Sequence, residues 1–221
     1  MTTALIDGDL ICYISAVSAD EADERFATYR AEKMLGRILE EVGCDSYRVF
    51  LSGGNNFRKQ INPEYKAQRP PPPEHLKACR QLMVDRHNAE VTNGYEADDA
   101  LGIAQTKDTV IATIDKDLLM VEGRHYNYVK KEWAEVSAKE GEYFFYKQMI
   151  TGDKVDNIIG IRGLGEKKAS KLLDTTPRKL WDKTITDLYI KEFEDGYHRA
   201  VQNTQLLWML QRDKQMPMEF K

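Results

Sequence analysis

The sequence predicts an α/β protein in which helices flank a mostly parallel central sheet, followed by a helical region. Short apolar runs alternate with amphipathic segments of helical spacing, a pattern typical of parallel sheets. After about residue 150 the apolar residues keep helical spacing. The 221 residues suffice for one well-buried domain with a small appended module. We therefore expect a core over residues 1–150 and a helical region over residues 151–221.

Apolar runs predict the strands, and apolar residues at helical spacing predict the helices. The strands cover residues 3–6, 47–51 and 109–114, with a small additional pair at 125–129 and 132–136. The helices cover residues 10–19, 21–42, 74–88, 96–106 and 142–151. Gly43 suits the C-cap of the second helix, and the prolines at 70–73 suit the start of the third. Residues 158–173 predict two helices around a glycine-rich hairpin, and helices continue to about residue 212.

Bulk charge and cysteine content narrow the functional classes. The net charge is −4 and the pI about 5.7, so the total charge gives no sign of a nucleic-acid ligand and local patches must decide. Cys12, Cys44 and Cys79 are far apart and odd in number, which argues against disulfides or a zinc site and favours a reducing cytoplasm. The chain reaches Asp7 and Asp9 before any long apolar run, so we expect neither a signal peptide nor a membrane span.

Acidic residues follow or open the predicted elements in four groups. The groups are Asp7 after the first strand, Glu96, Asp98 and Asp99 at a helix start, Asp115 and Asp117 after the third strand, and Asp153 and Asp156 before the hairpin. Glu96 and Asp99 share a helix face, as Asp153 and Asp156 do if their segment is helical. Because parallel strands end at one edge of a sheet, we expect the groups to converge on one cleft. A single aspartate at a strand end or helix start is usually a helix cap or a turn residue. That explanation accounts poorly for four acidic groups at such positions.

Eight carboxylates in one cleft repel one another and need counter-ions. Hard divalent cations with oxygen ligands, above all Mg²⁺, suit such a site. Two such ions about 3.5–4 Å apart form a clamp for phosphoryl displacement, in which one activates water and both stabilise charged oxygens. The sequence therefore predicts two Mg²⁺ ions, for which Mn²⁺ is an expected substitute.

The glycine-rich hairpin adds a candidate phosphate-binding surface. A tight glycine turn before a helix start exposes backbone N–H groups to a phosphate, and residues 161–180 hold six cations against two carboxylates. The residues expected to hold a DNA backbone without reading its sequence are Arg162, Gly163, Gly165, Lys167, Lys168 and Lys171. The plain alternative is an αα-hairpin with a solvated lysine face. Because these glycines join helices instead of following the first strand, we reject dinucleotide binding.

A basic and aromatic loop spans residues 62–69. Lys66 and Arg69 suit the stabilisation of charge on a reacting phosphate, and Tyr65 suits stacking on a splayed base. Exposed loops are often basic, so this segment alone decides nothing.

Five strings, in order along residues 3–175, together resemble the flap endonuclease / 5′–3′ exonuclease family, which includes phage 5′ nucleases and the 5′-nuclease domain of bacterial DNA polymerase I. The strings are IDGDL, EYKAQRP, YEADDALG, ATIDKDLL and GDKVDNIIGIRGLGEKKASKLL. The last is the most specific and resembles the family's helix–three-turn–helix element, which grips duplex DNA and often carries a K⁺ ion. The resemblance implies a PIN-like nuclease core and phosphodiester hydrolysis that leaves a 5′-phosphate and a 3′-hydroxyl.

The resemblance also implies roles for the matching positions. The implied ligands of the first metal are Asp7, Glu96 and Asp98, and those of the second are Asp99, Asp115, Asp117, Asp153 and Asp156. Lys66 and Arg69 are implied to contact the reacting phosphate, and with Asp7 and Asp99 they form the expected catalytic set. The implied substrate is DNA with a 5′ flap, a nick or a 5′ end, with RNA–DNA hybrids as a further candidate, in replication or primer removal. We expect a monomer in the cytoplasm of a bacterial cell or a phage-infected host, without a membrane partner.

The sequence departs from the family pattern in two places. Relatives usually carry an aspartate just after the second strand, where this chain has Ser52, and the loss of that carboxylate weakens the expected first metal site. Residues 70–95, with four prolines, are shorter than the helical arch of many relatives, which favours exonuclease action or an open clamp over threading of a single strand.

Three alternatives remain open. In a haloacid-dehalogenase-like phosphatase, Asp7 and Asp9 would be the nucleophile pair, but the usual threonine after the second aspartate is absent. A PIN-type RNase shares the acidic cleft but needs neither the basic hairpin nor this chain length. A non-catalytic binder of DNA junctions, with a metal site degraded through Ser52, predicts tight binding without cleavage.

Overall fold

The structure, a computed structural model, describes residues 1–19 and 23–212. Glu21, expected to begin a helix, and residues 213–221, expected in the helical region, lie outside the described residues. The chain forms two compact units, and the division differs from the single boundary expected near residue 150. Among described residues, the first unit comprises those up to 56, 70–137 and 209–212, and the second comprises 57–69 and 138–208.

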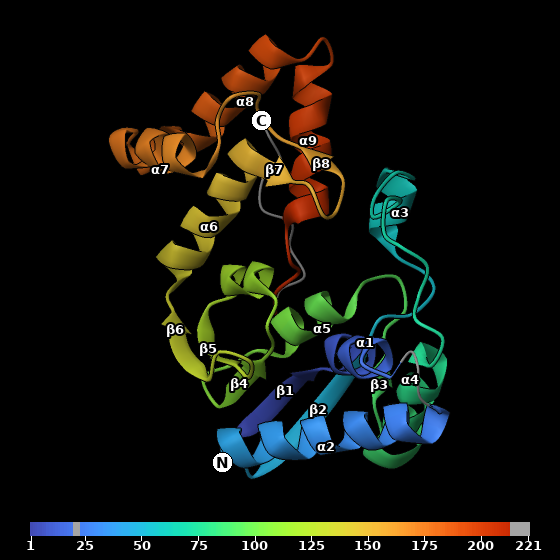
Figure 1. Cartoon of the computed structure of the whole chain (residues 1–221). Helices are drawn as coiled ribbons and strands as arrows, with labels where there is room; N and C mark the ends of the chain where they lie inside the picture. The colour runs from blue at the N-terminus through green and yellow to red at the C-terminus, as the bar shows by residue number, and fades with distance from the viewer. Residues whose placement is uncertain (20–22, 213–221) are drawn as a thin grey trace. The chain divides into compact units, whose positions relative to one another are not determined.

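A six-stranded sheet forms the centre of the first unit (Figure 1). Its strands run in the order β3-β2-β1-β4-β5-β6, and every neighbouring pair is parallel except β5 with β6. The strands are β1 Thr3–Asp7, β2 Ser46–Leu51, β3 Glu90–Val91, β4 Thr109–Ala112, β5 Gly123–Asn127 and β6 Glu132–Val136. The prediction of a mostly parallel sheet is confirmed. Strand β3 escaped prediction because two residues are too short to show alternation.

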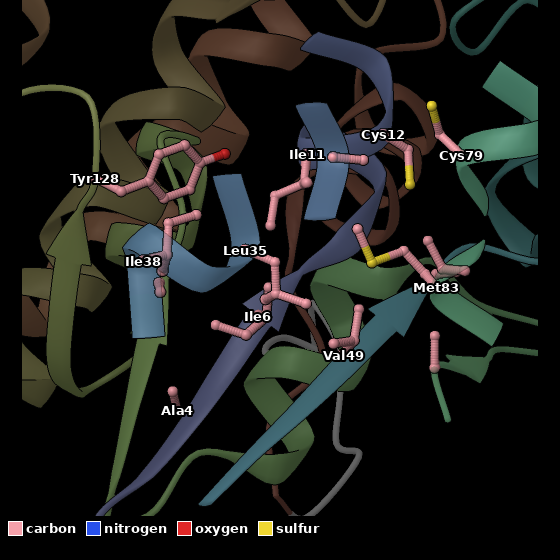
Figure 2. Close-up of a cluster of buried hydrophobic side chains, with 14 of the residues drawn as sticks. Ala4, Ile6, Ile11, Cys12, Leu35, Ile38, Val49, Cys79, Met83 and Tyr128 are labelled. Carbon is pink, nitrogen blue, oxygen red and sulfur yellow. The ribbon is translucent and has the colours of Figure 1, made fainter. Parts of the chain in front are cut away.

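Helices pack on both faces of this sheet. The helices of the first unit are α1 Gly8–Val17, α2 Glu24–Val42, α4 Leu76–His87, α5 Ala97–Ala104 and the 3₁₀ helix η1 Lys116–Met120. On one face α1, α2 and α4 bury a cluster with Ile6 and Val49 of the strands (Figure 2). Since side chains alternate along a strand, Leu5 faces the opposite way, where α5 contacts β1 and β2. The layers therefore leave the carboxyl ends of β1, β2 and β4 at one edge, as the sequence predicted.

The second unit is helical with one small hairpin. Its elements are α3 Phe57–Ile61, α6 Ala138–Thr151, β7 Gly152–Asp153, β8 Ile158–Ile159, α7 Glu166–Thr175, the 3₁₀ helix η2 Arg178–Leu180, α8 Trp181–Glu192 and α9 Gly196–Leu207. The prediction of a helix beginning at residue 158 is wrong, because Ile158–Ile159 pairs antiparallel with β7. Gly152 has a positive φ of 69°, and a Cβ on it would lie 2.3 Å from the Gly160 nitrogen, so the hairpin requires glycine at this crossing.

The segment that precedes the proline run is held in the second unit by buried Arg58. Its side chain is fully buried, donates to the carbonyls of Leu206 at 2.9 Å and Trp208 at 2.6 Å, and lies over the Phe57 ring. Helix α3 was not predicted from the sequence, because five residues are too few to show a helical period. In the part of the chain that the structure describes, no helix is both long and apolar enough to cross a bilayer.

Candidate active site

The edge of the first unit's sheet carries Asp7 at the end of β1. Asp7 is 2 % exposed and caps α1, since its Oδ1 accepts the Leu10 N–H at 3.2 Å. Its Oδ2 accepts the Thr113 hydroxyl at 2.9 Å, just beyond the end of the neighbouring strand β4. The first predicted ligand therefore lies at the predicted sheet edge, held by two donors.

Thr113 connects Asp7 with the acidic pair that follows β4. The same hydroxyl that donates to Asp7 accepts the Asp115 N–H at 3.0 Å. Asp115 caps η1, and its Oδ1 accepts the Asp117 N–H at 2.8 Å. The structure thus brings together two of the predicted acidic groups, and Thr113, which sequence reasoning missed, lies between them.

The third acidic group opens α5. Glu96 is the N-cap residue, Asp98 is partly exposed, and Asp99 is fully buried. Asp99 Oδ2 accepts the Glu96 N–H at 3.0 Å and Oδ1 accepts the Leu210 N–H at 2.9 Å. Both Asp99 oxygens therefore stabilise the backbone, the capping role that is common for an aspartate in the first turn. Glu96 and Asp98 are the more accessible carboxylates of this group.

Negative charge accumulates at this edge. Burial above all, and then the charges of Asp9 and Asp115, raise the pKa of Asp7 to about 7, against the lowering effect of the Leu10 and Thr113 hydrogen bonds. Carboxylate oxygens bind hard divalent cations, whose positive charge balances this accumulation. Among residues 1–19 and 23–212, however, no three His, Cys, Asp or Glu side chains converge closely enough to hold an ion in this arrangement. The chemistry of these oxygen ligands nevertheless fits a hard cation.

The fourth acidic pair belongs to the second unit and lies at the β7–β8 turn. The segment is not helical, so the condition for a shared helix face is not met. Asp153 Oδ1 accepts the Val155 N–H at 2.8 Å within the same turn. The neighbouring Asp156 pairs with Arg69 at 2.8 Å and with Lys66 Nζ at 3.7 Å. The two cations predicted to meet a phosphate therefore gather around one predicted carboxylate.

Tyr65 corrects one expectation. Its side chain is 2 % exposed, and its hydroxyl donates to Asp156 Oδ2 at 3.1 Å. The ring is therefore buried and does not offer a face for stacking on a base. Its role in the structure is to hold Asp156, together with the Lys66 backbone N–H, which donates to the Asp156 carbonyl at 3.1 Å.

The glycine-rich turn precedes α7 as predicted. Gly163 has a positive φ of 76°, and Gly165 is the N-cap residue of α7. Lys168 Nζ donates to the Gly163 carbonyl at 2.9 Å, which closes the turn. The cationic side chains of the predicted surface are all exposed, namely Arg162, Lys167, Lys168 and Lys171. Cations beside backbone N–H groups at a helix start suit a phosphate.

A second group that sequence reasoning missed lies beside Asp7. Arg80 of α4 forms an ion pair with Asp9 and donates to the Ser52 carbonyl. No local pattern reveals this pair, because its members are 71 residues apart in the chain. Only the Asp-Gly-Asp string at residues 7–9 marked Asp9 as unusual.

Comparison with known proteins gives a matching family model and relatives that include a DNA polymerase I and a flap endonuclease. The family model described as the 5′–3′ exonuclease N-terminal resolvase-like domain matches residues 2–150. The thermostable DNA polymerase I of Thermus aquaticus is 28% identical over 197 residues, covering 77% of this chain and 23% of the polymerase. Flap endonuclease Xni of Shewanella baltica (strain OS185) is 27% identical over 192 residues, covering 77% of this chain and 73% of that protein. The chain thus spans less than a quarter of the polymerase and most of the flap endonuclease.

Solved structures share the fold. The T5 D15 protein co-crystallized with metal ions superposes with a TM-score of 0.68 at 17% identity, covering 94% of this chain and 90% of that one. The bacteriophage T5 D15 flap endonuclease, in a pseudo-enzyme-product complex with DNA and metal ions, gives a TM-score of 0.67 at 18% identity and covers 94% and 86%. The family model extends over most of this chain, and the acidic groups of the first unit all lie within it. The chain belongs to the 5′–3′ exonuclease family.

Proposed function

We propose that this protein is a metal-dependent 5′ nuclease that hydrolyses DNA phosphodiesters at 5′ ends, nicks or flaps during replication or primer removal. The observation that carries the proposal is the acidic sheet edge, with Asp7, Glu96 and Asp115 at strand ends and a helix start, in a chain of this family. The relatives' names support the same activity, since they include a flap endonuclease and a DNA polymerase I.

We assign two Mg²⁺ ions to the carboxylates, with Mn²⁺ as a substitute. The proposed ligands of the first ion are Asp7, Glu96 and Asp98, and those of the second are Asp99, Asp115, Asp117, Asp153 and Asp156. When bound, such ions lower the pKa of water and stabilise charge on the reacting phosphate. The chain's own part is to keep the carboxylates ionised and oriented, which the Thr113 hydroxyl supports for Asp7. Lys66 and Arg69, now paired with Asp156, are proposed to exchange that partner for the phosphate.

Duplex DNA is proposed to bind at the turn before α7. Exposed cations there suit non-sequence-specific backbone contacts, whose affinity falls with salt. A K⁺ ion at the same turn, RNA–DNA hybrids as further substrates, a monomeric state and the cytoplasm of a bacterial cell or phage-infected host follow from the family resemblance as parts of the proposal.

A cleavage assay tests this function. The protein is incubated with a labelled 5′-flap duplex and a blunt duplex, in Mg²⁺ or in EDTA, beside Asp115→Asn and Asp153→Asn. The control is Asp187→Asn, an exposed aspartate of α8 that forms a surface pair with Lys183. We expect Mg²⁺-dependent cleavage that both test variants lose and the control keeps, and product lengths separate flap cutting from end digestion. Cleavage that persists in EDTA, or in both test variants, contradicts the proposal.

The second candidate function is a non-catalytic binder of DNA junctions. The observation that favours it is Ser52, whose hydroxyl accepts the Ala97 N–H at 2.9 Å at a position where relatives usually carry an aspartate. Flap DNA bound tightly and left uncut in both Mg²⁺ and Mn²⁺ would decide for this candidate.

A further inference from the structure

A chain of polar contacts at the acidic edge of the first unit joins four elements. Arg80 of α4 pairs with Asp9 of α1 and donates to the Ser52 carbonyl. The Ser52 N–H donates to Asp9 Oδ2 at 2.8 Å, and the Ser52 hydroxyl accepts the Ala97 N–H at 2.9 Å. Ser52 directly follows β2 and Ala97 is the first residue of α5, so the contacts tie α4 and α1 to the start of α5.

Every polar group of Ser52 is used in this chain of contacts. Its N–H, carbonyl and hydroxyl each have a partner, and each partner comes from a different element. The N–H at the first position of a helix has no partner within the helix. The Ser52 hydroxyl supplies that partner from outside, whereas Asp99 caps the neighbouring Glu96 N–H from within. The orientation of α5 against the sheet edge therefore depends on a side chain that follows β2.

The ion pair between Arg80 and Asp9, at the other end of this series of contacts, is partly shielded from water. The side chains of Arg80 and Asp9 are 28% and 30% exposed, against 63% and 41% for Arg86 and Glu32. Pairs as exposed as the second contribute little to stability. Since Arg86 belongs to the same helix, it offers a matched cation outside the chain of contacts.

We propose that Ser52 and Arg80 are positioning residues that hold the start of α5, and with it Glu96 and Asp98, in register with Asp7 for metal binding. This inference rests on the proposed function. Neither residue is assigned to touch metal or substrate. Ser52, at the position where relatives usually carry a carboxylate, contributes by orienting the carboxylates of the next helix.

The effect on metal binding separates positioning from simple charge. Removing a cation beside carboxylates strengthens the binding of a divalent cation if only charge matters. Loosening the support of the ligands weakens it, and the loss of an outer partner typically costs about 10- to 100-fold in metal affinity. Arg80→Gln therefore gives opposite results under the two interpretations.

The test measures Mn²⁺ affinity from the free-ion signal in electron paramagnetic resonance, alongside kcat and the Mg²⁺ concentration for half-maximal cleavage. The variants are Ser52→Ala, Ser52→Thr, Arg80→Gln and the control Arg86→Gln, each checked by circular dichroism. We expect Ser52→Ala and Arg80→Gln to weaken Mn²⁺ binding about tenfold, with kcat largely recovered at saturating Mg²⁺. Ser52→Thr, which keeps the hydroxyl, and Arg86→Gln should bind as the wild type does.

Three results would overturn the inference. They are wild-type Mn²⁺ affinity in Ser52→Ala, tighter binding in Arg80→Gln, and equal losses in Ser52→Thr and Ser52→Ala. If Ser52→Ala does not fold, Arg80→Gln decides alone. A wild-type protein that binds Mn²⁺ but cuts no DNA contradicts the proposed function, while the affinities still decide this inference. A wild-type protein that binds no Mn²⁺ overturns both.

Discussion

Thr113 shows how one hydroxyl organises the acidic edge. It donates to Asp7 and accepts from the Asp115 N–H, and its side chain is buried at 6% exposure. Thr113→Val keeps the shape and removes both hydrogen bonds, so the partly buried Asp115 N–H and the buried Asp7 carboxylate oxygen each lose a partner. We expect the free energy of unfolding to fall by about 1–3 kcal/mol in urea denaturation and the Mg²⁺ requirement to rise.

The control is Thr28→Val on α2, where the hydroxyl donates to carbonyls of its own helix. This variant should change stability by no more than about 0.5 kcal/mol. Equal stability of the Thr113 variant and the control would show that the Asp7–Thr113–Asp115 contacts contribute nothing measurable.

The predictability of single residues depends on whether their signal is local. The places of Asp7, Glu96 and Asp115 in the fold were predictable because strand ends and helix starts can be located in the sequence. Thr113 was not predictable, since its partner Asp7 lies 106 residues away in the sequence. Tyr65 was misjudged for the same reason, because its partner Asp156 lies 91 residues away and turns an apparently exposed loop residue into a buried one.

At the scale of elements, a close backbone approach constrains the β7–β8 hairpin. A Cβ on Gly160 would lie 2.3 Å from both the Gly152 nitrogen and the Thr151 carbonyl carbon, and these backbone atoms cannot move aside cheaply. Gly160→Ala should therefore lower the free energy of unfolding by about 1–3 kcal/mol. Thermal denaturation followed by circular dichroism measures the change.

Gly36 on α2 provides the opposite case. A Cβ there meets nothing within 4 Å, and the residue lies inside a long helix. Gly36→Ala should stabilise the protein by about 0.5–1 kcal/mol. If Gly160→Ala melts at or above the wild-type temperature, as Gly36→Ala is expected to do, the steric argument for the hairpin fails.

The hairpin also marks the limit of element prediction. Long amphipathic helices such as α2 were predicted closely, including the C-cap Gly43 with its positive φ of 63°. Residues 158–159 were assigned to a helix because two isoleucines show no alternation, and only their pairing with β7 makes them a strand. Short elements are fixed by partners, which periodicity does not reveal.

At the scale of the whole molecule, the division into units could not be read from a single boundary. Residues 57–69 belong with the C-terminal helices because buried Arg58 binds carbonyls at 206 and 208, some 150 residues away. The mostly parallel sheet was predictable from the alternation of strands and helices. The interleaving of the two units along the sequence was not predictable, since it depends on such distant contacts.

The buried charge of Asp7 lowers the stability of the first unit, and the proposed function explains why the carboxylate is present. Asp7 is buried and its pKa is raised to about 7, so its folded state binds a proton more tightly than the unfolded chain does. Stability from this group is therefore lost as the pH rises from about 4 to 7. Asp7→Asn removes the charge, and an amide still accepts from Leu10 and can donate to the Thr113 hydroxyl.

We therefore expect Asp7→Asn to melt at a higher temperature than the wild type in EDTA at pH 8, by an amount that shrinks as the pH falls below 7. In Mg²⁺ the order should change, because ligand binding stabilises only the protein that binds the ion. Differential scanning fluorimetry with and without Mg²⁺ measures both, and Asp187→Asn should follow the wild type in each. A variant less stable than the wild type in EDTA would mean that the Asp7 carboxylate serves folding first, whereas a Mg²⁺-induced shift equal to that of the wild type would remove Asp7 from the proposed ligands.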